Sequence, residues 1–322
     1  MSTAERHARR RAIATALFVT VLWSSSWILI RVGVDDESLP PLTFAAMRYS
    51  AAAGGLAGWV LAQPSTRSEL RSLRADQWRA LAALGLIYYA VTQGAQFVAI
   101  AHQPAATASL MLAPTPFLVA VLSQRSIGET VSRRQVAGAG LIIVGAVVFF
   151  AGDLGATVVG MTASVIKLGA NVTSSLLGRS MNRSQHLSPL TVTVASMTIG
   201  AAALAATGLM VDGVPRVTPT AGAIVGWLAV VNTAWAFTLW NSSLRYLTAV
   251  ESASINGTML IQIAVLAWLF LGESPGLIGA LGIAIVSSGA LLAQRGTATT
   301  TRRPIGTPRT TAGRASQQPP QP

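Results

Sequence analysis

The chain has 322 residues, of which 52% are hydrophobic and only 11% are charged, with a net charge of +12. A soluble protein carries about a quarter charged residues, so this chain has too few charges to cover a water-facing globule. The absence of cysteine excludes disulfide frameworks, iron–sulfur clusters and zinc–thiolate sites. The arginines flank apolar blocks, as in the cytoplasmic loops of membrane proteins. We therefore expect an integral membrane protein with no nucleic-acid partner, metal or cofactor.

Apolar blocks of about twenty residues, the length that crosses a bilayer as a helix, recur along the chain. The basic segment 1–11 precedes a block that is long enough to span, which indicates an uncleaved first helix rather than a signal peptide. Residues 294–322, rich in Thr, Pro, Gln and Arg, are predicted to form a disordered basic cytoplasmic tail. The sequence predicts an all-α fold with ten transmembrane helices, at about 12–33, 41–62, 79–101, 104–124, 134–151, 155–178, 188–210, 221–244, 249–271 and 276–293.

The basic residues predict how these helices are oriented. If the N-terminus lies inside, all of the 23 basic residues fall on inside segments except Arg31, Arg48, Lys167 and Arg216. This asymmetry follows the positive-inside rule, and removing one helix from the count would spoil it. We expect a multi-pass protein of the inner (plasma) membrane with both termini in the cytoplasm.

The two halves of the chain repeat each other. Residues 105–150 align with 249–294 without a gap, an offset of 144 that carries Gly128-Glu129 onto Gly272-Glu273. Because five helices per half is an odd number, the second copy enters the membrane from the opposite side. The sequence therefore predicts two inverted five-helix repeats, 12–151 and 155–293, an architecture typical of transporters.

Several short motifs occur in a fixed order along these repeats. They are Trp23–Trp27 followed by Arg31-Val32-Gly33, then Pro40–Tyr49, Gln103–Leu110 and Gly128-Glu129-Thr130, with second-half counterparts at Leu244–Ala249 and Leu271–Ser274. In these motifs the chain resembles the EamA-type members of the drug/metabolite transporter superfamily over about 12–293. The resemblance implies ten helices, two EamA repeats and transport of small solutes, with a tilt toward export. Glu251 and Lys167 depart from the usual family pattern.

Lys167 is the most informative single residue, because it lies near the middle of the sixth predicted span. A charge at that depth costs about 2.5–3.5 kcal/mol on insertion scales, so it usually faces a cavity or a partner. Ser164, Lys167 and Asn171 lie on one polar stripe at helical spacing. We interpret Lys167 as a residue that meets a substrate carboxylate or another anion, or that titrates during coupling. The alternative is a lysine that snorkels or bonds helix carbonyls. Arg48, in the second span, is expected to pair structurally with a carbonyl or with outer-loop acids.

The third and eighth spans carry further polar candidates. Tyr89, Gln93 and Gln96 follow one another at i, i+4 and i+7 and are predicted to share a helix face. Asn232 lies in the eighth span. Buried amides need partners, so these side chains either bind substrate or join helices together. Trp23 lies in mid-span rather than at the membrane edge, which favours a cavity wall suited to apolar or aromatic amino acids or organic cations.

Two predicted helix breaks fall at matching places in the repeats. Pro114 and Pro116 interrupt the fourth span, and Asn256-Gly257 falls in the ninth, where the offset places Pro114 on Thr258. Matched irregularities in the two halves are a pointer to a transporter binding site. The alternative is that Pro and Gly are simply commoner in membrane helices.

The sequence favours a secondary transporter of small metabolites such as amino acids or organic ions, working by alternating access. No nucleotide-binding loop is present, so we expect no ATP-driven step. An intramembrane enzyme would need a nucleophile and a base within the spans, for which only a serine–Lys167 pair is available. A channel or a non-transporting sensor is a further alternative. Gly54 and Gly58 form a small-residue spacing that serves packing within the fold or in a homodimer.

Overall fold

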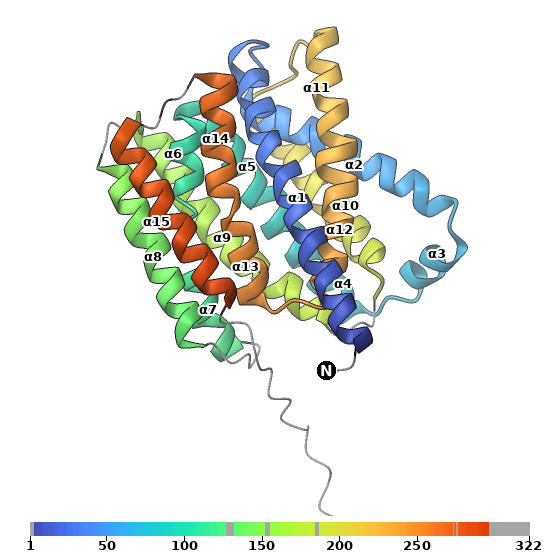
Figure 1. Ribbon diagram of the computed structural model, residues 1–322. Coiled ribbons are helices and arrows are strands. Elements are labelled where there is room, and N and C mark those ends of the chain that lie inside the picture. The colour runs from blue at the N-terminus through green and yellow to red at the C-terminus, as the bar shows by residue number, and fades with distance from the viewer. Residues whose placement is uncertain are drawn as a thin grey trace, which may run out of the picture.

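A computed structural model of the chain describes residues 3–126, 132–151, 155–183, 187–272, 274 and 276–295. Every regular element in these ranges is a helix, and the helices form one bundle (Figure 1). The predicted tail beyond Arg295, the Gly128-Glu129-Thr130 motif, Glu273 and the residues that join the two halves at 152–154 lie outside the described residues.

The first half contains nine helical elements. They are α1 (Thr3–Asp35), α2 (Pro41–Leu61), α3 (Pro64–Arg71), α4 (Ala75–Leu84), the π-helix η1 (Gly85–Val91), α5 (Thr92–His102), α6 (Ala105–Leu110), α7 (Thr115–Ser126) and α8 (Arg133–Phe150). The helix α1 begins well before the expected boundary at residue 12 and includes most of the basic segment, which contains no helix breaker. The elements α4, η1 and α5 follow one another without interruption, and a turn at 111–114 separates α6 from α7.

The second half repeats this order, except that its described residues contain no counterpart of α3. Its elements are α9 (Val158–Arg183), α10 (Pro189–Val211), α11 (Pro219–Ala229), the π-helix η2 (Val230–Trp235), α12 (Ala236–Ser243), α13 (Ala249–Gly257), α14 (Met259–Leu271) and α15 (Gly276–Arg295). Local chemistry sets several of these boundaries. Ser188 and Thr218 cap the first turns of α10 and α11, each of which has proline at its first position. Gly272 ends α14 in the left-handed conformation, at φ 68°.

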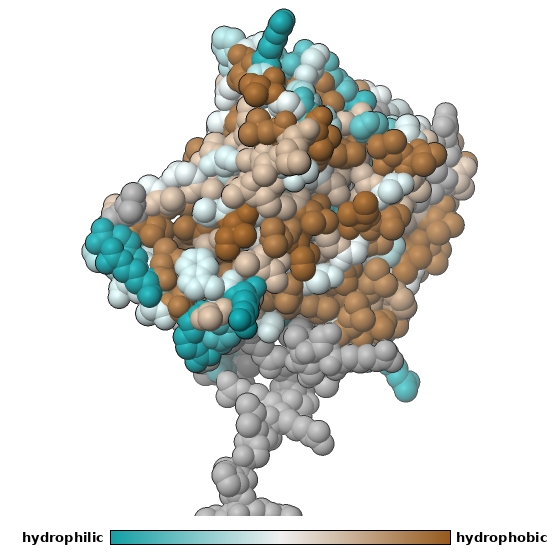
Figure 2. Space-filling model, turned by 180° about the vertical axis from the view of Figure 1, so that it is seen from behind, coloured by the Kyte–Doolittle hydropathy of each residue, from teal (hydrophilic) through white to brown (hydrophobic). Residues whose placement is uncertain are grey.

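The surface of the bundle is apolar around its middle. Seven segments of the described chain are long and apolar enough to cross a membrane: Glu5–Asp35, Ala75–His102, Ala105–Ser123, Pro189–Val211, Pro219–Ser243, Glu251–Leu271 and Gly276–Ala293. Figure 2 shows apolar residues across the middle of the rear face and hydrophilic groups toward its top and lower left. Exposed apolar side chains such as Val147, Trp227 and Phe270 contact lipid in a bilayer, whereas in water such a surface would aggregate. The chain is therefore a multi-pass membrane protein.

The helices α8 and α15 lie side by side at one edge of the bundle and show the relation between the halves directly (Figure 1). A methyl group added to Gly138 would lie 2.5 Å from the carbonyl oxygen of Gly289, and one added to Gly145 would lie 2.8 Å from that of Gly282. The offset of 144 carries Gly138 to Gly282 and Gly145 to Gly289, so it exchanges these two contacts. Such an exchange is expected of two copies related by a two-fold axis.

The same offset matches the irregular elements. It places η1 over residues 229–235, which include all of η2, and it places the turn at 111–114 over 255–258, where α13 gives way to α14. The helix α6 packs against α14 and α7 packs against α13, so each broken helix contacts its counterpart in the other half. The helix α1 begins and α15 ends at the same end of the bundle (Figure 1), as an even number of crossings requires.

Gly54 and Gly58 face outward from α2. A methyl group added at either position would meet no atom of the described chain within 4 Å. The small-residue spacing therefore does not serve packing within the described bundle, and a role between two copies stays a prediction.

Candidate functional site

A cavity lies between the two halves of the bundle. Its walls come from α1, α2, η1, α5, the turn at 111–114 and α7 of the first half and from α9, α12, α13 and α14 of the second. It has an empty volume of about 660 Å³, part of it open to solvent. Of the residues predicted to bind substrate, it brings together Trp23, Gln93, Gln96, Lys167, Asn171 and Asn256, with Gly257 from the second helix break. No aspartate or glutamate of the described chain lines it.

Lys167 of α9 is the centre of the polar part of the cavity. Its side chain is only 3% exposed, and its Nζ atom donates a hydrogen bond of 2.8 Å to Oε1 of Gln96 on α5. The same atom lies 3.9 Å from the centroid of the Trp27 ring on α1. A neutral acceptor and an aromatic face both stabilise an ammonium without neutralising it. Lys167 therefore joins the two halves across the cavity, and no acidic side chain of the described residues pairs with it.

Arg48 of α2 supplies a second cation, although sequence reasoning gave it a structural role. Its Nε donates to Thr233 Oγ1 at 2.6 Å, and its Nη2 donates to the carbonyl oxygen of Asn232 at 3.1 Å. These bonds confirm the expected pairing with a carbonyl. The guanidinium is nevertheless part of the cavity wall, and its Nη1 atom has no hydrogen-bond partner among the described residues.

The π-helix η1 changes which tyrosine faces the cavity. The spacing of Tyr89, Gln93 and Gln96 assumes an uninterrupted α-helix, but a π-helical turn holds an extra residue and rotates the residues that precede it. As a result Tyr88 lines the cavity together with Gln93 and Gln96. Tyr89 instead packs in the core, with its ring centroid 5.0 Å from that of Phe237. The predicted common face is therefore wrong for Tyr89.

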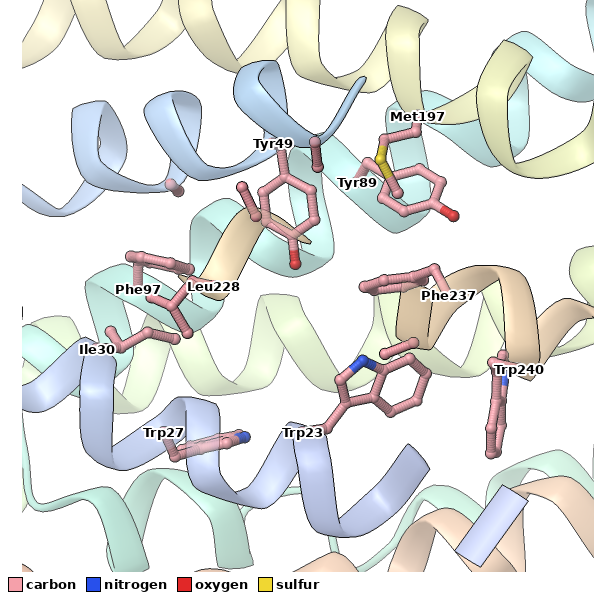
Figure 3. Packing of buried hydrophobic residues seen from close by; sticks show 14 of the residues in the cluster. Trp23, Trp27, Ile30, Tyr49, Tyr89, Phe97, Met197, Leu228, Phe237 and Trp240 are labelled. Carbon is pink, nitrogen blue, oxygen red and sulfur yellow. The ribbon is translucent and has the colours of Figure 1, made fainter. Parts of the chain in front are cut away.

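An aromatic cluster that includes Trp23 and Phe237 forms a second wall of the cavity. The ring centroid of Trp23 lies 4.8 Å from that of Phe237 and 5.0 Å from that of Trp240, and Figure 3 shows the three rings gathered between α1 and α12. The indole Nε1 of Trp23 donates to the carbonyl oxygen of Asn232 at 3.2 Å. Asn232 itself donates to the Leu22 carbonyl and to Ser25 Oγ. Asn232 thus joins η2 to α1 and does not line the cavity, which favours the helix-joining interpretation.

The two walls occupy equivalent positions of the two repeats. The offset of 144 carries Trp23 onto Lys167 and Trp27 onto Asn171, and it carries Gln93 onto Phe237. The helices α5 and α9 pack together and supply the polar members of these pairs, while α1 and α12 pack together and supply the aromatic ones. The helices around the cavity are therefore related by the repeat, but the side chains at equivalent positions are polar on one pair of helices and aromatic on the other. Such a division suits a molecule with one anionic and one apolar end.

The helix breaks contribute different residues from those expected. Gly257 lines the cavity, whereas at the first break Leu112 and Thr115 line it and Pro114 and Pro116 do not. A methyl group added at Gly257 would lie 3.6 Å from Cγ of Pro116, so the two breaks are in contact. Ser164 is also absent from the lining, because its hydroxyl is buried and accepts a hydrogen bond from Gln103 Nε2 at 2.8 Å.

An ion pair closes the end of the bundle where both described termini lie. Arg9 of α1 donates to Oε1 of Glu251, which is 6% exposed and belongs to the first turn of α13. The other carboxylate oxygen of Glu251 accepts from the backbone nitrogen of Thr248 at 2.7 Å, completing a capping box. One carboxylate therefore starts α13 and holds it to α1.

Comparison with known proteins identifies the architecture. A model of the EamA-like transporter family matches residues 10–151 and 160–294. The chain belongs to this family. Its two matched ranges agree with the two repeats that the glycine contacts relate.

Two named relatives are similar to this EamA-like chain. A "Probable terminal-alkyne amino-acid exporter" of Streptantibioticus cattleyicolor is 28% identical over 299 residues, covering 89% of this chain and 94% of the relative. A "Probable amino-acid metabolite efflux pump" of Escherichia coli K12 is 28% identical over 155 residues, or 48% of each chain. A solved structure titled "Crystal structure of protein" shares the fold, with a TM-score of 0.69, 20% identity and coverage of 89% of this chain and 98% of that one.

The sequence did not assign a substrate-binding role to several residues that line the cavity of this EamA-like chain, among them Arg48, Tyr49, Tyr88, Thr115 and Phe237. The rule that selected Lys167, a charge deep in a span, applies equally to Arg48. The offset of 144 relates Phe237 to the candidate Gln93 and would have found it. No sequence pattern indicated Tyr88, because regular α-helical spacing from Gln93 and Gln96 selects Tyr89 instead.

Proposed function

We propose that the chain is a secondary transporter that exports small amino-acid-type metabolites by alternating access of one cavity between its two halves. The observation that carries the proposal is Lys167, a buried cation from the second half whose contacts, Gln96 and Trp27, both belong to the first half. If the halves rock against each other, these contacts change with the conformation. A substrate at Lys167 is then coupled to the exchange between the inward-open and outward-open states.

The cavity chemistry supports a substrate that carries a carboxylate and an apolar group. Lys167 and Arg48 supply positive charge without a lining acid from the described chain, and Trp23, Trp27 and Phe237 supply apolar area. The names of the two relatives, an amino-acid exporter and an amino-acid metabolite efflux pump, support the same class and the outward direction.

The membrane topology of this proposal has ten crossings. Besides the seven apolar segments, α2, α8 and α9 have 21, 18 and 26 residues and lie in the same bundle. At 1.5 Å per residue, about 20 residues cover the roughly 30 Å of a bilayer core. The polar residues that lower the hydropathy of α9 face inward: Ser164, Lys167, Asn171 and Ser174 are all buried. The arginine asymmetry supports cytoplasmic termini in the plasma membrane.

Counterflow in proteoliposomes tests the function. Vesicles that contain the purified protein and excess unlabelled L-methionine, L-leucine or L-phenylalanine are diluted into the labelled amino acid, and label uptake is followed. We expect saturable counterflow for the wild type. Lys167→Met should reduce it by about tenfold or more, because a hydrogen-bonded charge is lost. Ile166→Met, at the half-exposed neighbouring position of α9, is the matched control and should retain the wild-type rate.

Direction and mechanism need two further measurements. Everted membrane vesicles should accumulate the amino acid if the protein exports, since their outer surface corresponds to the cytoplasm. A flux that rises linearly with concentration, without counterflow, would indicate a channel, and chemical conversion of the amino acid would indicate an enzyme. Either result contradicts the proposal.

A further inference from the structure

Four buried polar atoms of the cavity wall lack any hydrogen-bond partner within the described ranges. They are Arg48 Nη1, Tyr49 OH, Thr115 Oγ1 and Asn256 Oδ1. An unpartnered buried polar atom is rare and destabilising, so each one needs an explanation. Their gathering in one cavity is explained if a ligand supplies the missing partners.

Two of the four atoms are donors and lie on consecutive residues of α2. The Arg48 guanidinium carbon lies 5.2 Å from the centroid of the Tyr49 ring, and both side chains are at most 1% exposed. Thr233 and the Asn232 carbonyl hold the rest of the guanidinium, which leaves Nη1 free for a ligand. A cationic donor beside a phenol hydroxyl is suited to a carboxylate.

The other two atoms lie at the two helix breaks, and both can accept a hydrogen bond: Asn256 Oδ1 is an amide oxygen and Thr115 Oγ1 is a hydroxyl oxygen. Asn256 lies in the last turn of α13, and Thr115 opens α7, whose next residue, Pro116, packs beside Gly257. The last carbonyl groups of α13 give its C-terminal end a partial negative charge. An amide oxygen and a hydroxyl beside a helix C-terminus are suited to a cation that donates several hydrogen bonds, such as a primary ammonium.

We infer that the cavity recognises both charged groups of a zwitterionic α-amino acid. The carboxylate binds Arg48 Nη1 and Tyr49 OH, with Lys167 as the second cation. The ammonium binds Asn256 Oδ1 and Thr115 Oγ1, and the side chain contacts Trp23 and Phe237. This assignment rests on the proposed function and names the residues that determine its specificity.

Substrate analogues test the inference on the wild-type protein. The competitors in the counterflow assay are an L-amino acid, its 2-hydroxy acid, which lacks the ammonium, and its amide, which lacks the carboxylate. The amino acid should compete about tenfold or more better than either analogue, because a neutral hydroxyl or amide forms fewer or weaker hydrogen bonds with the buried atoms than the charged group that it replaces. Equal competition by the 2-hydroxy acid would contradict the ammonium site, and equal competition by the amide would contradict the carboxylate site.

Near-isosteric variants assign each preference to its residues. Tyr49→Phe should reduce the preference for the amino acid over its amide by about threefold or more, and it should leave the preference for the amino acid over its 2-hydroxy acid unchanged. Thr115→Val and Asn256→Leu should reduce the preference over the 2-hydroxy acid by the same factor and leave the preference over the amide unchanged. Since these atoms have no partner within the described protein, their removal should leave the melting temperature of the detergent-solubilised protein unchanged or raise it.

Ser254→Ala is the matched control. Ser254 Oγ is also buried and unpartnered in the described chain and lies on α13, but it does not line the cavity, so the variant should keep both preferences. If the wild type shows no amino-acid counterflow, the proposed function itself fails. If it transports amino acids but the variants shift both preferences equally, only this inference fails. If Asn256→Leu loses counterflow and added Na⁺ restores it, the helix breaks bind a metal cation, and this result would overturn the ammonium site.

Discussion

The contact between α8 and α15 and the central cavity are both built from equivalent parts of the two repeats, but they have diverged differently. At the α8–α15 contact the equivalent positions kept the same residue, because Gly138, Gly145, Gly282 and Gly289 each bring backbone against backbone. In the cavity, equivalent positions carry opposite chemistry, such as Trp23 opposite Lys167.

The difference shows which part of the fold tolerates change. Two helices in backbone contact leave no room for a side chain, so each position is limited to glycine in both copies. The residues that line a cavity must instead match the ligand. Because an amino acid carries different chemical groups at its two ends, equivalent positions in the two repeats need different residues.

The largest effect is expected at the α8–α15 contact. Gly138→Ala places a methyl group 2.5 Å from two backbone atoms of α15 and should lower the free energy of unfolding by about 1–3 kcal/mol. Gly140→Ala, on the same helix with no described atom within 4 Å of the added group, should change it by about 0.5 kcal/mol or less. Thermal unfolding in detergent measures both.

Gly282→Ala extends this comparison to the position of the second repeat that is equivalent to Gly138, where an added methyl group would lie 2.6 Å from the backbone nitrogen of Phe149. If the halves are related as the offset implies, this variant should destabilise the protein about as much as Gly138→Ala. Because Gly138 and Gly289 are in contact, the double variant Gly138→Ala/Gly289→Ala should cost less than the sum of the two single variants. Additive costs would contradict a shared contact.

An intermediate effect is expected at the aromatic wall. Trp23→Leu removes ring contacts with Phe237 and Trp240 and should weaken the apparent affinity for L-phenylalanine by about tenfold, since buried apolar contacts of this size contribute about 1–3 kcal/mol. The affinity for L-alanine, which cannot reach across the cavity, should change by less than about threefold. Competition counterflow provides both values. An equal loss of affinity for the two amino acids would show that this wall does not contact the substrate side chain.

The smallest effect is expected at the Arg9–Glu251 ion pair, because Arg9 is partly exposed. The Arg9 side chain is 30% exposed and that of Glu251 is 7% exposed, so solvent weakens the pair from the arginine side, and Arg9→Ala should open this end of the bundle by a factor of about two to five. The chain has no cysteine, so a single Ala253→Cys in the cavity wall can report opening through its maleimide labelling rate. Arg10→Ala removes the same charge one residue away from an exposed position and should leave the rate unchanged.

Much of the site could be predicted from the sequence because a charge in an apolar span leaves few physical options. Lys167 was expected to face a cavity, and it does. The polar stripe on α9 was expected to face inward, and Ser164, Asn171 and Ser174 are buried. The helix breaks were predicted at the right places because proline and glycine interrupt helices for local reasons.

The remaining features of the site could not be predicted, because they depend on a π-helix and on tertiary contacts, which no local sequence pattern indicates. The exchange of Tyr88 for Tyr89 follows from a π-helix, which no residue in Gly85–Val91 requires by itself. Asn232 and Ser164 have the residue types of a binding site, but their hydrogen bonds are used between helices. Whether an amide binds a ligand or a neighbouring helix is decided by tertiary contacts, which the spacing of polar residues does not contain. The number of crossings and the place of the tail beyond Arg295 stay predictions.

The two π-helices also affect how other members of the family should be read. Each adds a residue to one turn, so the phase of hydrophobic and polar residues slips by one position at Gly85–Val91 and again at Val230–Trp235. An alanine scan designed on regular helical spacing would test Tyr89 and pass over Tyr88. A pair of phase slips separated by one repeat length is therefore a mark that can be searched for in uncharacterised membrane chains, even where every residue of the pocket has changed.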